Sequence, residues 1–303
     1  MAAKQEWMRP ASGGQGEVYS CGWTGDRTER VLVIAHGMAE HSARYDDFAR
    51  FLADRGFAVY LNDHPGHGRS TQPQGHFQDE NGWSSTVEDL HALVGQAAGQ
   101  HPGKPLYLLG HSMGSFLSRS YLTRYGASLS GCILCGTMGK NPGVPLGLAL
   151  ARLQCKVKGP RSQGKLLSVL AFAGYNGKIN HPVNEFAWLS TVDQVCRDYK
   201  ADPLCGFPFT AGGYRDLFTG LTEITGPQWA RKVPKDLPIL LAAGDADPVG
   251  AYGKGPTQVA AWLRSAGCTE VDLKLYPGLR HELLNEHCKG QVYQDLLQWL
   301  LAH

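Results

Sequence analysis

Short apolar runs alternate along this chain with longer segments of helical spacing, and this alternation strongly constrains the fold. Strands are predicted at residues 31–35, 58–62, 106–109, 132–135, 238–244 and 271–278, and helices at 45–55, 83–99, 115–125, 256–266 and 287–302. Alternating strands and helices predict a mostly parallel sheet with helices on both faces. We therefore expect an α/β fold in which ligands bind beyond the carboxyl ends of the strands.

Residues 139–213 interrupt this alternation. Three helix-like segments, PLGLALARLQ, KLLSVLAFAGYN and EFAWLSTVDQVCRDYK, lie there between joints rich in proline and glycine. The pattern predicts a helical cap inserted into a core made of residues 1–138 and 214–303. Seven of the 29 basic residues, and none of the 27 acidic ones, fall within residues 140–180. This segment is interpreted as an ordinary solvated helix face or, in the alternative hypothesis, as a surface that contacts lipid or an acidic substrate.

The composition excludes several classes of protein. Hydrophobic residues make up 43% of the 303 residues, enough for a sizeable core, and the net charge of +2 predicts no nucleic-acid partner. The first residues show no apolar signal-peptide core, and no run approaches ~18 apolar residues, so we expect a cytoplasmic protein without a spanning helix. The eight cysteines are then expected to be free thiols, with Cys132 and Cys135 on opposite faces of one strand.

One serine lies between two glycines where a predicted strand meets a predicted helix, in YLLGHSMGSFLSRS (107–120). A turn this sharp strains the central residue, and the positions two residues before and after it have room only for hydrogen. Residues 110–114, GHSMG, match the G-x-S-x-G nucleophile elbow, which exposes the serine hydroxyl above the sheet. Ser112 is therefore the candidate nucleophile, and the rest of the chain must supply a base, an acid and an oxyanion hole.

Candidates for these partners follow other predicted strands. His281 comes after the strand VDLKLYPG and is the candidate base, because imidazole titrates near neutral pH. Asp247, with Asp245 as the alternative, follows the strand PILLAAG and is the candidate acid that orients the imidazole. The candidate oxyanion donors are the backbone N–H groups of Met113, next to the serine, and Met38, in the loop after VLVIA.

The remaining clusters of polar residues predict neither a cofactor nor a metal. The run DADPVG begins like a calcium loop, but Val249 and Pro256 occupy positions that need oxygen ligands. The segment DHPGHGRS (63–70) matches no zinc spacing and is interpreted as a hydrogen-bonded loop that supports the site. Neither GGQG (13–16) nor GHG (66–68) completes a dinucleotide fingerprint. We therefore expect chemistry that needs no cofactor.

Five segments together resemble the α/β-hydrolases of the monoacylglycerol lipase and lysophospholipase group, also described as serine aminopeptidase-like. They are HGMAEHSARY (36–45), DHPGHGRS (63–70), GHSMGS (110–115), GDADPV (244–249) and YPGLRHE (276–282), and they span nearly the whole predicted core. The resemblance implies an α/β-hydrolase fold in which the cap at 139–213 shapes an acyl pocket. It also implies that Ser112, Asp247 and His281 form a triad.

The resemblance further implies roles for Glu40 and Arg44. In monoacylglycerol lipases, the glutamate and arginine of the H-G-x-x-E-H-S-x-R segment help to organise the site and bind the glycerol end. This sequence departs from the animal enzymes at two positions: Gly250 stands where they carry a cysteine, and Leu284 where they carry a second histidine. We therefore expect the glycerol end of a substrate to be recognised differently here, or not at all.

Together these features predict a serine hydrolase that cleaves carboxylic esters, such as monoacylglycerols or lysophospholipids, through an acyl-enzyme on Ser112. An aminopeptidase-like amide hydrolase is the alternative within this class. A non-catalytic binding protein of the same fold is the alternative outside it, and such a protein is expected to lack a triad residue or an elbow glycine. The predicted partner is a small-molecule ester or lipid, with peripheral membrane contact through the cap as a further hypothesis.

Overall fold

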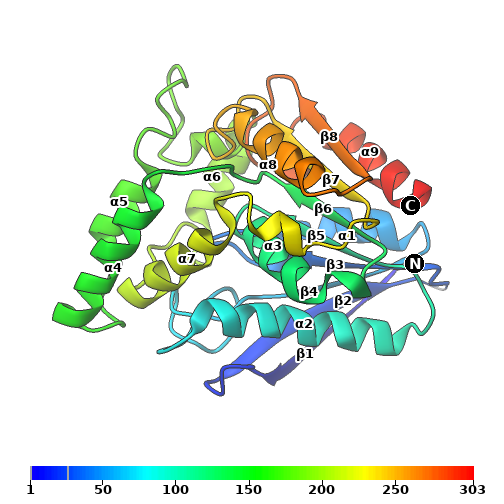
Figure 1. The fold of residues 1–303 in the computed structure, drawn as a ribbon, viewed down its shortest axis with the longest axis horizontal. Coiled ribbons are helices and arrows are strands. Elements are labelled where there is room, and N and C mark those ends of the chain that lie inside the picture. The colour runs from blue at the N-terminus through cyan, green and yellow to red at the C-terminus, as the bar shows by residue number, and fades with distance from the viewer. Residues whose placement is uncertain (1, 26) are drawn as a thin grey trace.

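The computed structural model describes residues 2–25 and 27–303, which form one eight-stranded sheet (Figure 1). The strands are β1 (Ala3–Pro10), β2 (Glu17–Thr24), β3 (Arg30–Ala35), β4 (Phe57–Asn62), β5 (Leu106–His111), β6 (Gly131–Cys135), β7 (Ile239–Gly244) and β8 (Val271–Tyr276). Their order is β1-β2-β4-β3-β5-β6-β7-β8. The pairs β1–β2 and β2–β4 are antiparallel, and every other pair is parallel.

The predicted mostly parallel sheet is thus confirmed, whereas β1 and β2 were absent from the sequence prediction. β1 (AKQEWMRP) lies at the sheet edge and alternates between exposed and half-buried residues. Its stability comes from pairing with β2 rather than from a buried apolar run, because an edge strand has a ladder on one side only. Local apolar pattern is therefore a weak signal for β1.

Helices cover both faces of the sheet. The core helices are α1 (Asp46–Ala53), α2 (Gly82–Gln100), α3 (Met113–Tyr125), α8 (Lys254–Ser265) and α9 (Lys289–Ala302). Buried residues of α1 and α9 belong to the hydrophobic cluster on one face, and those of α2, α3 and α8 to the cluster on the other. Each of these five helices begins and ends within two residues of its predicted limits.

Strand β3 shows how an unbroken apolar run builds both halves of this core. Val31, Val33 and Ala35 belong to one hydrophobic cluster, and Leu32 and Ile34 to the other. Successive side chains of a strand point to opposite faces, so a strand covered on both faces must be apolar at every position. The eight cysteines are free thiols, as expected, and Cys132 and Cys135 of β6 lie in opposite clusters.

Residues 139–213 leave the sheet after β6. They contain α4 (Val144–Lys158), α5 (Lys165–Phe172) and α6 (Asp193–Ala201), and Figure 1 shows α4 and α5 on the left, away from the sheet. Helix α7 (Ala211–Ile224) begins at the end of this segment and packs against α4. No helix within the described ranges has the length and hydropathy needed to span a bilayer.

The prediction of one helix across EFAWLSTVDQVCRDYK is only partly right. A short 3-10 turn at Ala187–Leu189 is followed by an extended residue, Ser190, and α6 begins only at Asp193. The N–H of Thr191 donates to the Glu286 carboxylate, from a segment far along the chain. A backbone donor committed to that carboxylate is not free to continue a helix, so tertiary contact overrides the local pattern.

Candidate active site

Ser112 lies at the strained turn that its sequence motif predicts. Its φ is 53° and its ψ is −120°, between the end of β5 and the start of α3. A Cβ atom added to Gly110 would lie 2.3 Å from the Gly114 carbonyl oxygen, and one added to Gly114 would lie 1.9 Å from the Ala35 carbonyl oxygen. Real side chains do not approach backbone atoms so closely, and both glycines are therefore required by the turn.

The structure brings Asp247, and not Asp245, to His281. The Asp247 Oδ2 lies 2.9 Å from the His281 Nδ1, and both side chains are buried. The other carboxylate oxygen of Asp247 accepts a hydrogen bond from the Val249 N–H at 2.8 Å, which fixes the carboxylate plane. Asp245 instead accepts from the Gly278 N–H at 2.7 Å and holds the loop that precedes the histidine.

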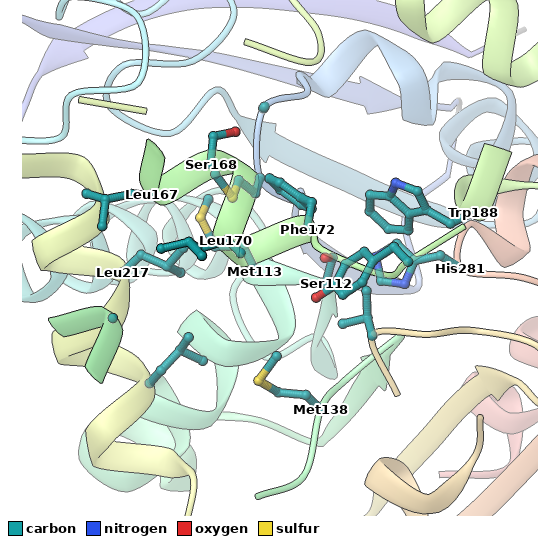
Figure 2. Close-up of a pocket in the computed structure, with 18 of the residues that line it drawn as sticks. Ser112, Met113, Met138, Leu167, Ser168, Leu170, Phe172, Trp188, Leu217 and His281 are labelled. Carbon is teal, nitrogen blue, oxygen red and sulfur yellow. The ribbon is translucent and has the colours of Figure 1, made fainter. Parts of the chain in front are cut away.

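The other ring nitrogen of His281 is free. Within the described part of the chain, Nε2 of His281 is buried and has no hydrogen-bond partner. His281 and Ser112 border the same cavity, of about 560 Å³, and Figure 2 shows them together with Trp188 and Phe172. The Trp188 ring lies 5.1 Å from the His281 ring. An imidazole held at Nδ1 and free at Nε2 is arranged to exchange a proton on the cavity side.

Met38 and Met113 border the cavity beside Ser112. Met113 is the first residue of α3, where backbone N–H groups have no carbonyl partner inside the helix. The loop that carries Met38 lies against the serine, because a Cβ added to Gly37 would be 3.2 Å from the Ser112 Cβ. Neither N–H group has a hydrogen-bond partner among residues 2–25 and 27–303, so both are available to an oxygen in the cavity.

Glu40 is buried beneath this loop. Its Oε1 accepts hydrogen bonds from the Gly37 N–H at 2.5 Å and from the Tyr45 hydroxyl at 2.8 Å, and lies 3.2 Å from the His111 Nδ1. Burial alone would raise the pKa of Glu40, but the contact with His111 and the nearby Arg44 hold that pKa well below its usual value. Glu40 is therefore a carboxylate that fixes the loop.

Arg44 bridges two buried carboxylates. It donates to Glu40 Oε2 at 2.7 Å and forms a bidentate pair with Glu282, at 2.5 and 2.7 Å. Glu40 borders the main cavity, whereas Arg44 does not. These contacts join both residues to a buried network of charges, and their role in organising the site and in binding substrate stays a prediction. Sequence reasoning did not single out Glu282, although it directly follows His281 in YPGLRHE.

Beyond Ser112 the cavity wall is mostly apolar, although Asn141, Ser168 and Glu185 also border it. Its aliphatic and aromatic residues include Met138, Val144, Leu150, Leu167, Leu217, Phe218 and Leu221, drawn from the segment after β6 and from α4, α5 and α7. Leu284, which stands in place of the second histidine of the animal enzymes, is buried in the core and does not border the cavity. The cavity thus has one polar end, at the serine, and an apolar interior.

The segment DHPGHGRS is a hydrogen-bonded loop, as the sequence analysis predicted. The Asp63 carboxylate accepts from the backbone N–H groups of Ser42 and Arg69, at 2.7 and 2.8 Å. One other cluster, of His41, Asp202 and Cys205, brings three possible metal ligands together within the described residues. His41 and Asp202 bond to each other at 2.8 Å, and burial raises the pKa of the Cys205 thiol, which favours a polar contact over a metal site.

A serine at the elbow, followed in the chain by an aspartate and a histidine that meet on one mostly parallel sheet, defines the class of α/β-hydrolases. A family model described as "Serine aminopeptidase, S33" matches residues 26–288. The chain belongs to this family, and the predicted resemblance and fold are confirmed.

Several similar proteins are lipases and esterases by name. The chain is 34% identical over 287 residues to a monoacylglycerol lipase of Mycolicibacterium smegmatis, covering 93% of this chain and 91% of that protein. It is 26% identical to the human monoglyceride lipase, over 92% of this chain and 84% of that protein. A carboxyl esterase of Bacillus coagulans, solved in complex with glycerol, superposes with a TM-score of 0.94 at 31% identity, over 99% of this chain and 98% of that one.

Proposed function

We propose that this protein hydrolyses carboxylic esters of lipids through an acyl-enzyme on Ser112. The observation that carries the proposal is the free, buried Nε2 of His281, whose Nδ1 is held by Asp247, in the cavity that Ser112 borders. The chemistry follows from this arrangement. Nε2 accepts the serine proton as the hydroxyl oxygen attacks the ester carbonyl, and the Asp247 carboxylate stabilises the imidazolium that forms.

The negative charge that develops on the carbonyl oxygen is stabilised by the backbone N–H groups of Met38 and Met113. Collapse of the tetrahedral intermediate expels the alcohol, which takes the proton from Nε2 of His281 and leaves an acyl group on Ser112. A water molecule then gives its proton to the same nitrogen and attacks the acyl carbon, which releases the fatty acid. His281 serves as base and then as acid in each half of the cycle.

The cavity favours a substrate with one long apolar chain. A volume of about 560 Å³ lies within the range of small-ligand sites, and most of the wall beyond the serine offers apolar contact. All three carboxylates that border it are already paired, Glu40 and Glu282 with Arg44 and Glu185 with Lys200. An amide substrate with a free ammonium group would need an unpaired carboxylate, so we favour monoacylglycerols and lysophospholipids over peptides.

Residues 139–213 act, in this proposal, as the cap that closes the acyl site. Six of the nine exposed large hydrophobic side chains found in the described residues lie on α4 and α5, between 53% and 69% exposed: Leu146, Leu153, Val157, Leu166, Val169 and Leu170. Leu146, Leu153 and Val157 recur at helical spacing, so they share one face of α4. Leu146, Val169 and Leu170 also border the cavity, which connects this outer apolar face with the acyl site.

Four basic residues lie on these two helices: Arg152, Lys156 and Lys158 on α4, and Lys165 on α5. None of these four forms an ion pair within the described ranges. Lys140, Arg161 and Lys178 lie in the adjoining segments, where Arg161 pairs with Asp79 and Lys178 lies over the Tyr252 ring. An apolar face flanked by unpaired positive charge suits a surface of anionic lipid. We therefore propose that α4 and α5 rest on the lipid that supplies the substrate, which is the peripheral membrane contact considered from the sequence.

Fluorescent phosphonate labelling followed by substrate competition tests the catalytic proposal. We expect covalent labelling of the wild-type protein, none of Ser112→Ala, and competition by monoacylglycerols and lysophospholipids of long chain before aminoacyl amides. Aminoacyl amides that compete better than any lipid would replace the ester assignment by the aminopeptidase alternative. A folded wild-type protein without label would support the non-catalytic alternative.

Vesicle cosedimentation tests the membrane contact separately. Each lysine near an anionic surface contributes about 1 kcal/mol, or about a five-fold change in binding, so the double variant Lys156→Gln/Lys158→Gln should bind anionic vesicles at least ~10-fold more weakly. The double variant Leu153→Ser/Val157→Ser should also lose binding, whereas Leu301→Ser, an exposed leucine on α9, should not. Equal binding by all variants would refute the contact.

A further inference from the structure

Three buried histidines lie close together beneath the loop that carries Met38, and the mechanism above uses none of them. The ring of His36 lies 4.0 Å from that of His64 and 5.3 Å from that of His67. All three side chains are buried. Burial lowers the pKa of His36 to about 3 and that of His67 to about 4, so these rings are neutral near pH 7.

The hydrogen bonds of His36 fix its tautomer. The backbone N–H of His64 lies 2.9 Å from Nε2 of His36, and a backbone N–H can only donate, so Nε2 is the acceptor. The proton of the neutral ring is therefore on Nδ1, an assignment that follows from the hydrogen-bond network. Nδ1 lies 2.8 Å from the Gly37 carbonyl oxygen and donates to it.

Both polar backbone groups of Gly37 are thus held by buried side chains. His36 binds its carbonyl oxygen, and Glu40 accepts from its N–H at 2.5 Å. The carbonyl oxygen of Gly37 belongs to the same peptide unit as the N–H of Met38. In a planar trans peptide these two groups point in opposite directions, so an oxygen drawn to His36 turns the Met38 N–H away from that ring.

We propose that His36 is a positioning residue that holds the Met38 N–H in the orientation needed to stabilise the oxyanion. The peptide it anchors packs against Ser112, since a Cβ on Gly37 would lie 3.2 Å from the serine Cβ. Without the Nδ1 donor, the Gly37 carbonyl loses its buried partner, and rotation of this peptide would point an oxygen where a donor is needed. This inference rests on the proposed ester hydrolysis and adds a residue that does not itself touch the substrate.

Comparison with the two other histidines shows that hydrogen bonding at both ring nitrogens is specific to His36. His64 Nδ1 and His67 Nε2 are buried without hydrogen-bond partners in the described residues, whereas both ring nitrogens of His36 are bonded. A buried nitrogen without a partner costs stability, and the packing of this cluster does not prevent that cost at His64 and His67. Of the three rings, only His36 has hydrogen bonds at both nitrogens. Its engagement is with the loop next to Ser112.

The test compares an ester with the thionoester of the same acyl and leaving groups. A thionoester develops negative charge on sulfur, a longer and weaker hydrogen-bond acceptor than oxygen, so a well-placed donor increases the ester rate more than the thionoester rate. His36→Asn keeps an N–H donor near the position of Nδ1, and His36→Leu has nearly the same shape without it. His76→Leu is the matched control, because it removes a buried imidazole whose two nitrogens bond Thr210 and Asp79 and which does not border the cavity.

We expect His36→Leu to lose about 10²–10³-fold in kcat for the ester, the usual effect of removing one oxyanion donor, with KM changed by less than ~3-fold. Its ester-to-thionoester rate ratio should fall at least ~10-fold, and His36→Asn should recover most of that ratio. His76→Leu should keep the wild-type ratio even if it is less stable. Should His36→Leu fail to fold, His36→Met replaces it as the variant without a donor.

A donor-free variant that folds and keeps the wild-type ratio would overturn the proposal, as would equal loss in His36→Asn. Failure of the proposed function looks different, because the wild-type protein would then turn over no ester, or Ser112→Ala would turn it over equally well. Wild-type turnover that depends on Ser112 therefore separates the two conclusions.

Discussion

Gly114→Ala tests the packing of the elbow with a single added carbon. The new Cβ would lie 1.9 Å from the Ala35 carbonyl oxygen, and side-chain carbons essentially never approach closer than 3.0 Å. The start of α3 must therefore move away from β3 by about 1.1 Å, the difference between these distances. The obstacle is backbone of the central sheet, which cannot yield as a flexible side chain would.

This displacement has two measurable consequences. Overpacking of a tight site typically costs about 1–3 kcal/mol, so the urea midpoint should fall. The same shift moves Ser112 and the Met113 N–H relative to His281, and a misplacement of ~1 Å commonly costs about 100-fold in rate. We therefore expect Gly114→Ala to keep less than about 5% of the wild-type kcat for a short p-nitrophenyl ester.

Gly95→Ala is the matched control. Gly95 lies in α2, is exposed, and has no other atom within 4 Å of an added Cβ. Alanine is favoured over glycine inside a helix by about 0.5–1 kcal/mol, so this variant should be more stable than wild type and fully active. Near-normal stability and kcat in Gly114→Ala would refute the claim that the turn has no room for a side chain at residue 114.

Three further predictions concern ionisable side chains. Asp247→Asn should lower kcat by about 10³–10⁴-fold, because an amide favours the wrong tautomer of its imidazole partner. Asp245→Asn should lower stability more than kcat. A larger loss of kcat in Asp245→Asn than in Asp247→Asn would make Asp245 the acid. Arg44→Met leaves two buried carboxylates without a cation and should lower the free energy of unfolding by about 3–5 kcal/mol in urea titrations, and a loss below ~1 kcal/mol would contradict the network. Burial lowers the pKa of His36 to about 3 and of His67 to about 4, while unfolded histidine titrates near ~6.5. Between ~6.5 and ~4 the unfolded chain therefore binds more protons, so the urea midpoint should fall as the pH is lowered through this window. A constant midpoint would show that the folded and unfolded states bind equal numbers of protons there, which would contradict the lowered pKa values.

The sequence located the elbow because its chemistry is local. Gly110, Ser112 and Gly114 are close in the chain, and the steric demand of a strand-to-helix turn acts over these few residues. The choice between Asp247 and Asp245 was not local. Both follow the same strand, and only the folded loops decide that one carboxylate reaches the imidazole while the other binds the Gly278 N–H.

Periodicity by itself determined the alternating layers and the central strands, since burial on both faces of a strand or one face of a helix leaves a pattern in neighbouring residues. It also placed the candidate serine, aspartates and histidine after predicted strands. The tertiary structure alone decided the pairing of Arg44 with Glu282 and the hydrogen bonds that hold Gly37. Arg44 and Glu282 lie 238 positions apart in the chain, whereas the bonds to Gly37 are local but buried. The strength of all these contacts depends on distances of a few ångströms and on exclusion of water, neither of which a local pattern encodes.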